Sequence, residues 1–177
     1  MRGFFSVGVE GMSKPGNAGN LIRTAHSFGA SSFFAIAPVV DFGEVRSSDT
    51  SDAFEHLPFY QYQTPAALDL PKGAQLVGVE LVEASIPLPS FRHPTRAAYV
   101  LGPERGVLSA ELQARCDFLV QIPMSFCVNV GVAGAIVMYD RMISMGRFAE
   151  RPVRAGGPTE AVAKHKHGGQ IIRSNRQ

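Results

Sequence analysis

The sequence predicts an α/β fold in which helices cover both faces of a parallel β-sheet. Two observations lead to this prediction. The expected strands are continuous apolar runs, as strands buried on both faces of a sheet require, and segments with helical periodicity separate several of them. The chain of 177 residues, 45% of them apolar, is also long enough to bury a substantial core in one domain.

The predicted strands are short runs rich in β-branched and aromatic residues. The first run, FFSVGVE, ends at Gly11, and the second, SFFAIA, ends at Pro38. The full set of predicted strands comprises residues 4–10, 32–37, 58–62, 75–81, 97–102 and 118–122.

Apolar residues at helical spacing predict the helices. Within 18–29, such residues recur from Leu21 to Phe28, and Gly29 stands where a helix is expected to stop. Two further helices are predicted, from Ser109 to about Arg115 and from about Val128 to Arg147.

Three segments have weaker patterns. Residues 38–57 are polar and predict only a short helix near 49–55, and the strand at 58–62 is weakly indicated. Residues 84–96 contain three prolines, so we expect an irregular loop there.

Three turns rich in glycine, proline or small polar residues follow predicted strands. GMSKPGN follows the strand at 4–10, GPERG follows the strand that begins at 97, and PMSFC follows the strand at 118–122. In parallel sheets, ligands bind at the carboxyl ends of the strands. The layout alone therefore predicts a binding site at this edge of the sheet.

The three turns lie in segments that resemble a known family. Three segments are similar, in order and spacing, to the three motifs of the SpoU (TrmH-type) branch of the SPOUT RNA methyltransferases. The segments are KPGNAGNLIRTAHSFG, LGPERG, and IPM followed by a helix of small residues. The resemblance covers roughly residues 4–147. It implies transfer of a methyl group from S-adenosylmethionine to a ribose 2'-hydroxyl of tRNA or rRNA.

The resemblance also carries expectations about architecture and partners. It implies the SPOUT fold, with a C-terminal trefoil knot that threads the segment after IPM through the loop after GPERG, and a homodimer. Because the first strand starts at residue 4, the chain is similar to the minimal members of the family, which tend to act on tRNA. We therefore expect tRNA rather than rRNA as the substrate.

The first motif supplies the expected catalytic arginine. The spacing Asn17, Gly19, Arg23 matches N-x-G-x-x-x-R, in which the family uses the arginine in catalysis. Arginine is a poor base because its pKa exceeds about 12, but its planar group binds phosphate at two points. We expect Arg23 to fix the RNA phosphate and ribose; proton acceptance by a transiently neutral Arg23 is the family's alternative. Asn17 either caps the helix or, as the resemblance implies, supports Arg23.

The other two motifs complete the expected site. The resemblance makes Glu104 an active-site or dimer-interface carboxylate and adds Asn129 to the catalytic set. The cofactor is expected to bind largely through backbone groups at adjacent strand ends, where glycine permits close approach and Ile and Met offer apolar contact. The expected cofactor residues are Val79, Gly102, Ile122, Met124, Cys127 and Val128.

The third motif departs from the common family pattern. C-V-N-V-G-V-A replaces S-L-N-V-S-V-A, and Cys127 follows Met124 after only two residues. A role ascribed to the family's serine therefore does not transfer to Cys127. A cysteine nucleophile is a rival interpretation, but no histidine lies nearby in the sequence. The small residues Gly131, Ala133, Gly134 and Ala135 fit either a dimer interface or the packed knot.

Charge separates the chain into two parts. Residues 151–177 contain six basic residues and one acidic residue, a net charge of +5, whereas residues 1–150 carry 11 basic and 14 acidic residues, a net charge of −3. We expect a methyltransferase domain over 1–150 and a flexible basic tail that either contacts a polyanion or is solvated without a role.

Several classes are disfavoured. The five histidines lack zinc-ligand spacing, so we expect no metal. Two cysteines, the absence of a signal-peptide pattern and the lack of a membrane-spanning apolar run favour a cytoplasmic protein without membrane contact. The principal alternative function is a non-catalytic RNA-binding protein with the same fold, which the intact set Asn17, Arg23, Glu104 and Asn129 disfavours.

Overall fold

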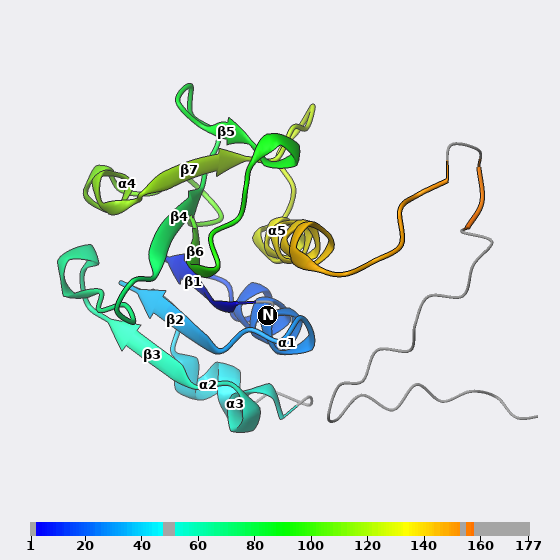
Figure 1. Ribbon diagram of the computed structural model, residues 1–177. Helices are drawn as coiled ribbons and strands as arrows, with labels where there is room; N and C mark the ends of the chain where they lie inside the picture. Colours follow the sequence, from blue (N-terminus) through cyan, green and yellow to red (C-terminus); the bar gives the residue numbers. More distant parts are fainter. Residues whose placement is uncertain (1–2, 48–51, 153–154, 158–177) are drawn as a thin grey trace, which may run out of the picture. The chain divides into compact units, whose positions relative to one another are not determined.

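A parallel sheet forms the centre of residues 1–146, as expected from the sequence (Figure 1). The computed structural model describes residues 3–47, 52–152 and 155–157, and within them the sheet has seven strands in the order β3-β2-β1-β6-β4-β7-β5. All strand pairs are parallel. The strands are β1 (Phe4–Glu10), β2 (Ser32–Ile36), β3 (Phe59–Tyr62), β4 (Gln75–Val79), β5 (Ile86–Pro87), β6 (Arg96–Leu101) and β7 (Phe118–Gln121).

Helices lie on both faces of this sheet, and Figure 1 shows α1 and α5 side by side on one face and α4 on the other. In the part of the chain that the structure describes, no helix has the length and apolar character needed to span a membrane. The helices are α1 (Pro15–Ser27), α2 (Phe42–Ser47), α3 (Ala53–His56), α4 (Ala110–Arg115) and α5 (Val130–Met145), with the short 3-10 turns η1 (Pro65–Ala67) and η2 (Leu88–Ser90).

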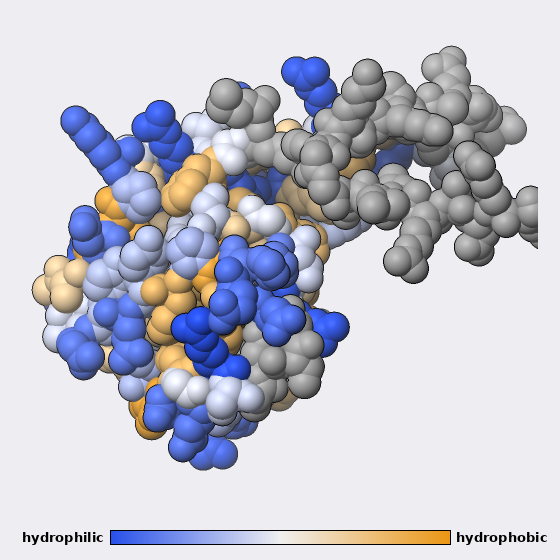
Figure 2. All heavy atoms as spheres, turned by 90° about the horizontal axis from the view of Figure 1, so that it is seen from below, coloured by the Kyte–Doolittle hydropathy of each residue, from blue (hydrophilic) through white to orange (hydrophobic). Residues whose placement is uncertain are grey.

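Strand β6 shows why the strands read as continuous apolar runs. Ala97, Tyr99 and Leu101 belong to the core under α1 and α5, whereas Ala98 and Val100 belong to the core on the opposite face. Successive side chains of a strand point to opposite faces, so a strand covered on both sides is apolar at nearly every position. Outside the core, Figure 2 shows one face on which hydrophilic side chains predominate and hydrophobic ones form smaller patches.

The small residues of α5 serve packing within the chain. A Cβ atom added to Gly134 would lie 2.3 Å from Cδ1 of Leu21 on α1, and Gly131 is buried as well. Glycine at these positions therefore lets the axes of α1 and α5 approach closely. For Gly134 the structure shows packing against α1 within the chain, whereas the expected dimer interface and knot stay predictions.

A chain of buried polar groups also holds α5 to the sheet. Nη1 of Arg141, a residue that is 3% exposed, donates to Tyr99 Oη on β6 at 3.1 Å and to the carbonyl oxygen of Pro94 at 2.6 Å. Tyr99 Oη lies 2.6 Å from Nδ1 of His93, and Nε2 of His93 lies 2.8 Å from Oδ2 of Asp140 on α5. Two residues of α5 are thus tied to β6 and to the segment that precedes it.

Most element boundaries differ slightly from the predicted ones. Helix α1 begins at Pro15 rather than at residue 18, because proline is well suited to the first helical position. Helix α5 begins at Val130 because Asn129 caps it by accepting a 2.8 Å hydrogen bond from the Gly131 amide. Strand β4 ends at Val79, where the Glu80 carboxylate accepts from the next amide, that of Leu81.

Three segments depart further from the prediction. The expected loop 84–96 contains β5 and η2, although β5 is only two residues long and pairs with β7 at the edge of the sheet. Helix α2 was not predicted. The short helix expected near 49–55 is observed as α3 at 53–56, and residues 48–51 lie outside the described residues.

The strand register brings the three predicted turns to one edge. Val9 of β1 and Val79 of β4 both pair with Leu101 of β6, and Val79 also pairs with Val120 of β7. The carboxyl ends of these four strands are therefore level. The turns that follow β1, β6 and β7 emerge together, as the layout predicted.

Candidate active site

Glu104, in the turn after β6, is the centre of a polar cluster. Its Oε2 accepts from the Ser13 hydroxyl at 2.8 Å and from the Ser13 amide at 3.2 Å, and its Oε1 accepts from the Lys14 amide at 3.1 Å and from Nδ2 of Asn17 at 3.0 Å. Partial burial raises the pKa of Glu104, but the hydrogen bonds from Asn17 and Ser13 outweigh this effect and leave the pKa below its ordinary value. An ionised Glu104 thus joins the turn after β1 to the turn after β6.

Asn17 continues this cluster to the start of α5. Its Oδ1 accepts a 2.9 Å hydrogen bond from Nδ2 of Asn129, whose own Oδ1 accepts from the Gly131 amide. Three of the four expected catalytic residues therefore form one hydrogen-bonded chain from Glu104 through Asn17 to Asn129. The N-cap interpretation of Asn17 is wrong, because α1 begins at Pro15, with Lys14 in the capping position.

Arg23, the fourth expected catalytic residue, lies apart from this chain. It is exposed on α1, six residues beyond Asn17, or about 1.7 helical turns, so the two side chains leave the helix in different directions. Within the described residues its guanidinium makes no hydrogen bond or ion pair, and its carbonyl oxygen accepts from the Ser27 hydroxyl. A single copy of the chain does not bring Arg23 to Glu104, Asn17 and Asn129.

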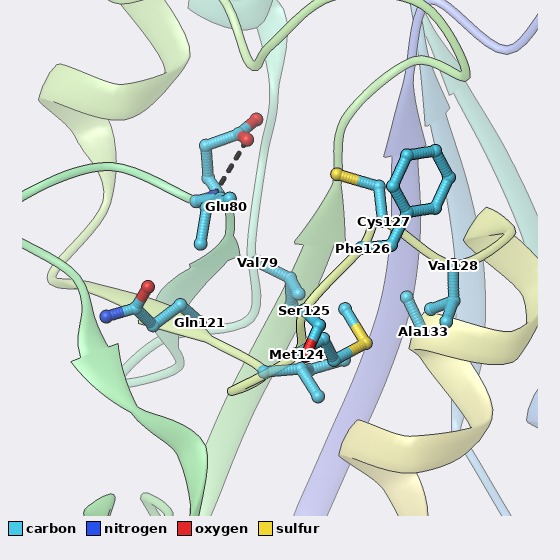
Figure 3. Close-up of a pocket in the computed structure, with 11 residues that line it drawn as sticks. Val79, Glu80, Gln121, Met124, Ser125, Phe126, Cys127, Val128 and Ala133 are labelled. Atoms are coloured by element: carbon cyan, nitrogen blue, oxygen red, sulfur yellow. Dashed lines mark hydrogen bonds between the residues drawn. The ribbon is translucent and has the colours of Figure 1, made fainter.

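A cavity of about 290 Å³ lies beside this cluster, between the ends of β4 and β7 and the segment that leads to α5 (Figure 3). Five of the six expected cofactor residues line it, namely Val79, Ile122, Met124, Cys127 and Val128. The other lining residues were not among those expected to bind the cofactor; they are Glu80, Leu81, Gln121, Ser125, Phe126 and Ala133.

Gly102, the sixth expected cofactor residue, lies at the edge of this cavity rather than in its lining. A Cβ atom at Gly102 would lie 3.1 Å from Oε2 of Glu80, a lining residue, and 3.3 Å from the backbone nitrogen of Leu108. A larger residue at position 102 would press on the Glu80 carboxylate and on the backbone of Leu108. Glycine therefore keeps this strand end open.

Two carboxylates that the sequence analysis missed hold the loop after GPERG. Glu80 at the end of β4 accepts from the Leu108 amide at 2.7 Å, and Glu10 at the end of β1 accepts from the amide and hydroxyl of Ser109 at 2.7 and 2.6 Å. Glu10 is only 7% exposed. A charged residue that ends a buried strand was the available signal for both.

The two cysteines differ in their surroundings. Burial raises the pKa of Cys116 to about 11, so its thiol stays protonated near neutral pH. Cys127 is exposed at the cavity and has no hydrogen-bonded base among the residues described. This arrangement does not favour a cysteine nucleophile. Over the same residues, no group of three or more His, Cys, Asp or Glu side chains is placed to hold a metal ion.

The fold and this site agree with a family comparison. The family model described as "SpoU rRNA Methylase family" matches residues 5–139. Because the match spans most of the chain, the protein belongs to the SpoU rRNA methylase family, and the resemblance inferred from the motifs is confirmed.

Two curated relatives carry names that describe RNA methylation. The "23S rRNA (guanosine-2'-O-)-methyltransferase RlmB" of Coxiella burnetii (strain RSA 493 / Nine Mile phase I) is 32% identical over 141 residues, which is 75% of this chain and 55% of the relative. The mouse (Mus musculus) "tRNA (guanosine(18)-2'-O)-methyltransferase TARBP1" is 27% identical over 138 residues, which is 73% of this chain and 9% of the relative. This chain therefore spans about half of the bacterial relative and a small part of the mouse one.

Solved structures confirm the fold class. The SpoU methyltransferase AviRb from Streptomyces viridochromogenes, solved in complex with the cofactor AdoMet, is 23% identical with a TM-score of 0.69 and covers 79% of this chain and 60% of its own. An RNA 2'-O ribose methyltransferase is 26% identical with a TM-score of 0.67 and covers 81% of this chain and 57% of its own.

Proposed function

We propose that this protein transfers a methyl group from S-adenosylmethionine to a ribose 2'-hydroxyl of structured RNA. The observation that carries the proposal is the hydrogen-bonded series Glu104–Asn17–Asn129, which lies beside a ligand-sized cavity at the carboxyl edge of the sheet. The protein that holds this site is a member of the SpoU family. The names of both curated relatives support it, since both specify guanosine 2'-O-methylation. We take tRNA as the first candidate substrate, as the mouse name specifies, and rRNA as the second.

The cavity residues fit S-adenosylmethionine. The volume of the cavity is close to the lower end of the range for small-molecule sites, roughly 300–1,000 Å³. Val79, Ile122 and Val128 offer apolar contact to the adenosine, and Gly102 keeps the neighbouring strand end open. The Glu80 carboxylate at the edge suits a cationic ligand. When bound, the cofactor supplies an electrophilic methyl group.

The polar cluster holds the acceptor ribose. Glu104 already accepts four hydrogen bonds, so its role is to fix the turn at 13–17 rather than to take a proton from the substrate. The side-chain amide of Asn17 donates one of its two N–H groups to Glu104, and that of Asn129 donates one to Asn17. The second N–H group of each amide can therefore donate to a ribose oxygen. Arg23 binds the adjacent phosphate and orients the hydroxyl.

We further propose that the protein is a homodimer and that each active site contains Arg23 from one copy and the Glu104–Asn17–Asn129 chain from the other. The isolation of Arg23 within one chain supports this. The outer side of α5 offers a surface, because Val132 and Tyr139, two turns apart on one side of the helix, are 45% and 49% exposed. A stable interface there should bury more than about 1,000 Å².

Several expectations remain proposals for the rest of the chain. We propose a trefoil knot formed by the segment after β7 and the loop after β6, supported by the clamping of that loop through Glu10 and Glu80. We also propose a methyltransferase domain over 1–150, a basic tail that contacts RNA and a cytoplasmic location. Most of residues 151–177 lie outside the described residues.

Single-turnover transfer of labelled methyl groups tests the proposal. The protein is incubated with labelled S-adenosylmethionine and either bulk tRNA or rRNA, and the digested RNA is analysed for 2'-O-methylated nucleosides. We expect label in a ribose-methylated nucleoside from tRNA. Label in rRNA alone would make rRNA the substrate, whereas RNA binding without transfer would favour a non-catalytic RNA-binding protein.

A further inference from the structure

Phe126 is the most exposed of the large apolar side chains in the described residues, with 87% of its surface open to solvent. It lines the mouth of the cavity, in the short segment between β7 and α5. Leu81, Met124 and Val128, at the same cavity, are 61%, 40% and 39% exposed. An exposed group of large apolar side chains indicates a surface that meets a ligand or partner.

The position of Phe126 separates it from the cofactor contacts. Figure 3 shows the ring of Phe126 extending from the loop in the direction away from Met124 and Ser125. A cavity of about 290 Å³ has room for one small ligand, and a ring that is 87% exposed is not enclosed in it. The ring is therefore open to solvent at the cavity and free to meet a ligand that arrives from outside.

The acceptor side of the site is close to this ring. Phe126 precedes Asn129 by three residues, so their Cα atoms are at most about 11 Å apart. Asn129 binds Asn17, and Asn17 binds Glu104. The exposed cations Lys14 and Arg105 flank these residues in the chain. An aromatic ring, hydrogen-bond donors for a sugar, and cations that neighbour those donors in the chain together have the composition of a groove that binds single-stranded nucleic acid.

We propose that Phe126 is a stacking platform for the base of the nucleotide that is methylated. The inference rests on the proposed function and extends it to the base. Reaching a ribose in structured RNA requires a nucleotide that has left its helical stack, and an aromatic ring replaces the lost stacking partner. Phe126 thereby positions the target nucleotide, while Asn17 and Asn129 hold its ribose.

A single tryptophan can report on this stacking, because the chain contains no tryptophan. Phe126→Trp places the only indole at the proposed platform, and Tyr60→Trp, at a 53% exposed aromatic position on β3, is the matched control. We expect tRNA to quench the emission of Phe126→Trp and not that of Tyr60→Trp. S-adenosylhomocysteine alone should have no such effect.

Three results would overturn the inference. Quenching by S-adenosylhomocysteine alone would make Phe126 a cover for the cofactor. A change in emission on dilution of the protein alone would place Phe126 in a protein interface. No change with RNA, under conditions in which the wild-type protein methylates it, would leave Phe126 without a stacking role.

Kinetics supply a second readout. Phe126→Ala should weaken RNA binding and raise KM for RNA roughly tenfold, as expected for loss of one base–aromatic stack, while S-adenosylmethionine affinity measured by calorimetry stays unchanged. Phe126→Tyr should retain the wild-type KM, and Phe126→Leu, which is apolar but cannot stack, should behave like the alanine variant. A wild-type protein that transfers no methyl group to any RNA would refute the proposed function and the inference with it; active wild-type protein with an equally active Phe126→Ala variant would refute the inference alone.

Discussion

At the scale of the residue, Glu104 acts through the donors that surround its carboxylate. Glu104→Gln replaces one oxygen by an N–H group, which then faces a donor from Ser13, Lys14 or Asn17. Loss of an acceptor in this cluster should lower the free energy of unfolding by roughly 1–2 kcal/mol and reduce methyl transfer. Because the pKa of Glu104 is lowered in the folded state, its stabilising effect is present above its ordinary pKa and is lost as the pH falls through the lowered value.

Denaturant unfolding and single-turnover transfer, measured on the same sample, test this role. A positioning residue should lose stability and activity together. A glutamine variant with wild-type stability and a severe loss of transfer would instead make Glu104 a group that reacts with the substrate.

Replacement of Arg23 should reduce activity without reducing stability. Arg23→Ala removes an exposed side chain without partners among the described residues, so the variant should fold with wild-type stability. Methyl transfer to RNA should nevertheless fall on the order of a hundredfold or more, because a charge that positions the reacting groups is lost. Arg23→Lys should not rescue it, since an ammonium group cannot make the planar two-point contact.

Transfer of labelled methyl groups to tRNA, with cofactor binding measured in parallel by calorimetry, checks this prediction. Cofactor affinity should be nearly unchanged. Near wild-type transfer by the alanine variant would show that Arg23 is an ordinary surface residue.

At the scale of the element, the sequence predicted what burial determines. Strands β1, β2 and β6 are buried along most of their length, so most of their positions are apolar and the runs were visible. The two-residue strand β5 left no such pattern, and its Pro87 is tolerated because β5 lies at the sheet edge. Helix α2, with only two buried residues, was equally inconspicuous.

The site was predictable to the extent that local motifs carried it. The turns that contain Asn17 and Glu104, and the motif with Asn129 that follows the third turn, were visible, and the strand layout placed them at one edge. The contacts of Glu10 and Glu80 with the loop after GPERG were missed because they join residues far apart in the sequence. Glu10 binds Ser109 across 99 positions, and Glu80 binds Leu108 across 28. The separation of Arg23 from the cluster likewise follows from helix geometry rather than from the motif.

The attachment of α5 to the sheet should depend on pH. Burial lowers the pKa of His93 below its ordinary value of 6.5, although the hydrogen bond and charge of Asp140 oppose this effect. Burial also raises the pKa of Tyr99 to about 12, so Tyr99 stays protonated and donates to a neutral His93. Below about pH 6.5 the unfolded chain binds a proton that the folded chain excludes, and stability falls by up to roughly 1.4 kcal/mol per pH unit.

Denaturant unfolding between pH 5 and pH 8 (about the range in which histidine titrates) measures this slope. His93→Asn should be less stable at all pH values but should show a flatter dependence on pH in the acidic half of the range. Equal slopes for the variant and the wild-type protein would exclude His93 as the source.

At the scale of the whole molecule, the proposed dimer predicts that two inactive variants restore each other. If Arg23 of one copy serves the Asn17–Asn129 pair of the other, a dimer of one Arg23→Ala chain and one Asn129→Ala chain contains one site with both residues intact and one site with neither. Equal mixing places half of the dimers in this mixed form, so co-refolded variants should recover about a quarter of wild-type transfer. Arg23→Ala refolded alone, so that every dimer holds two copies of the same variant, is the control. If the site lay within one chain, every site in the mixture would lack one residue, and the mixture would be no more active than the separate variants.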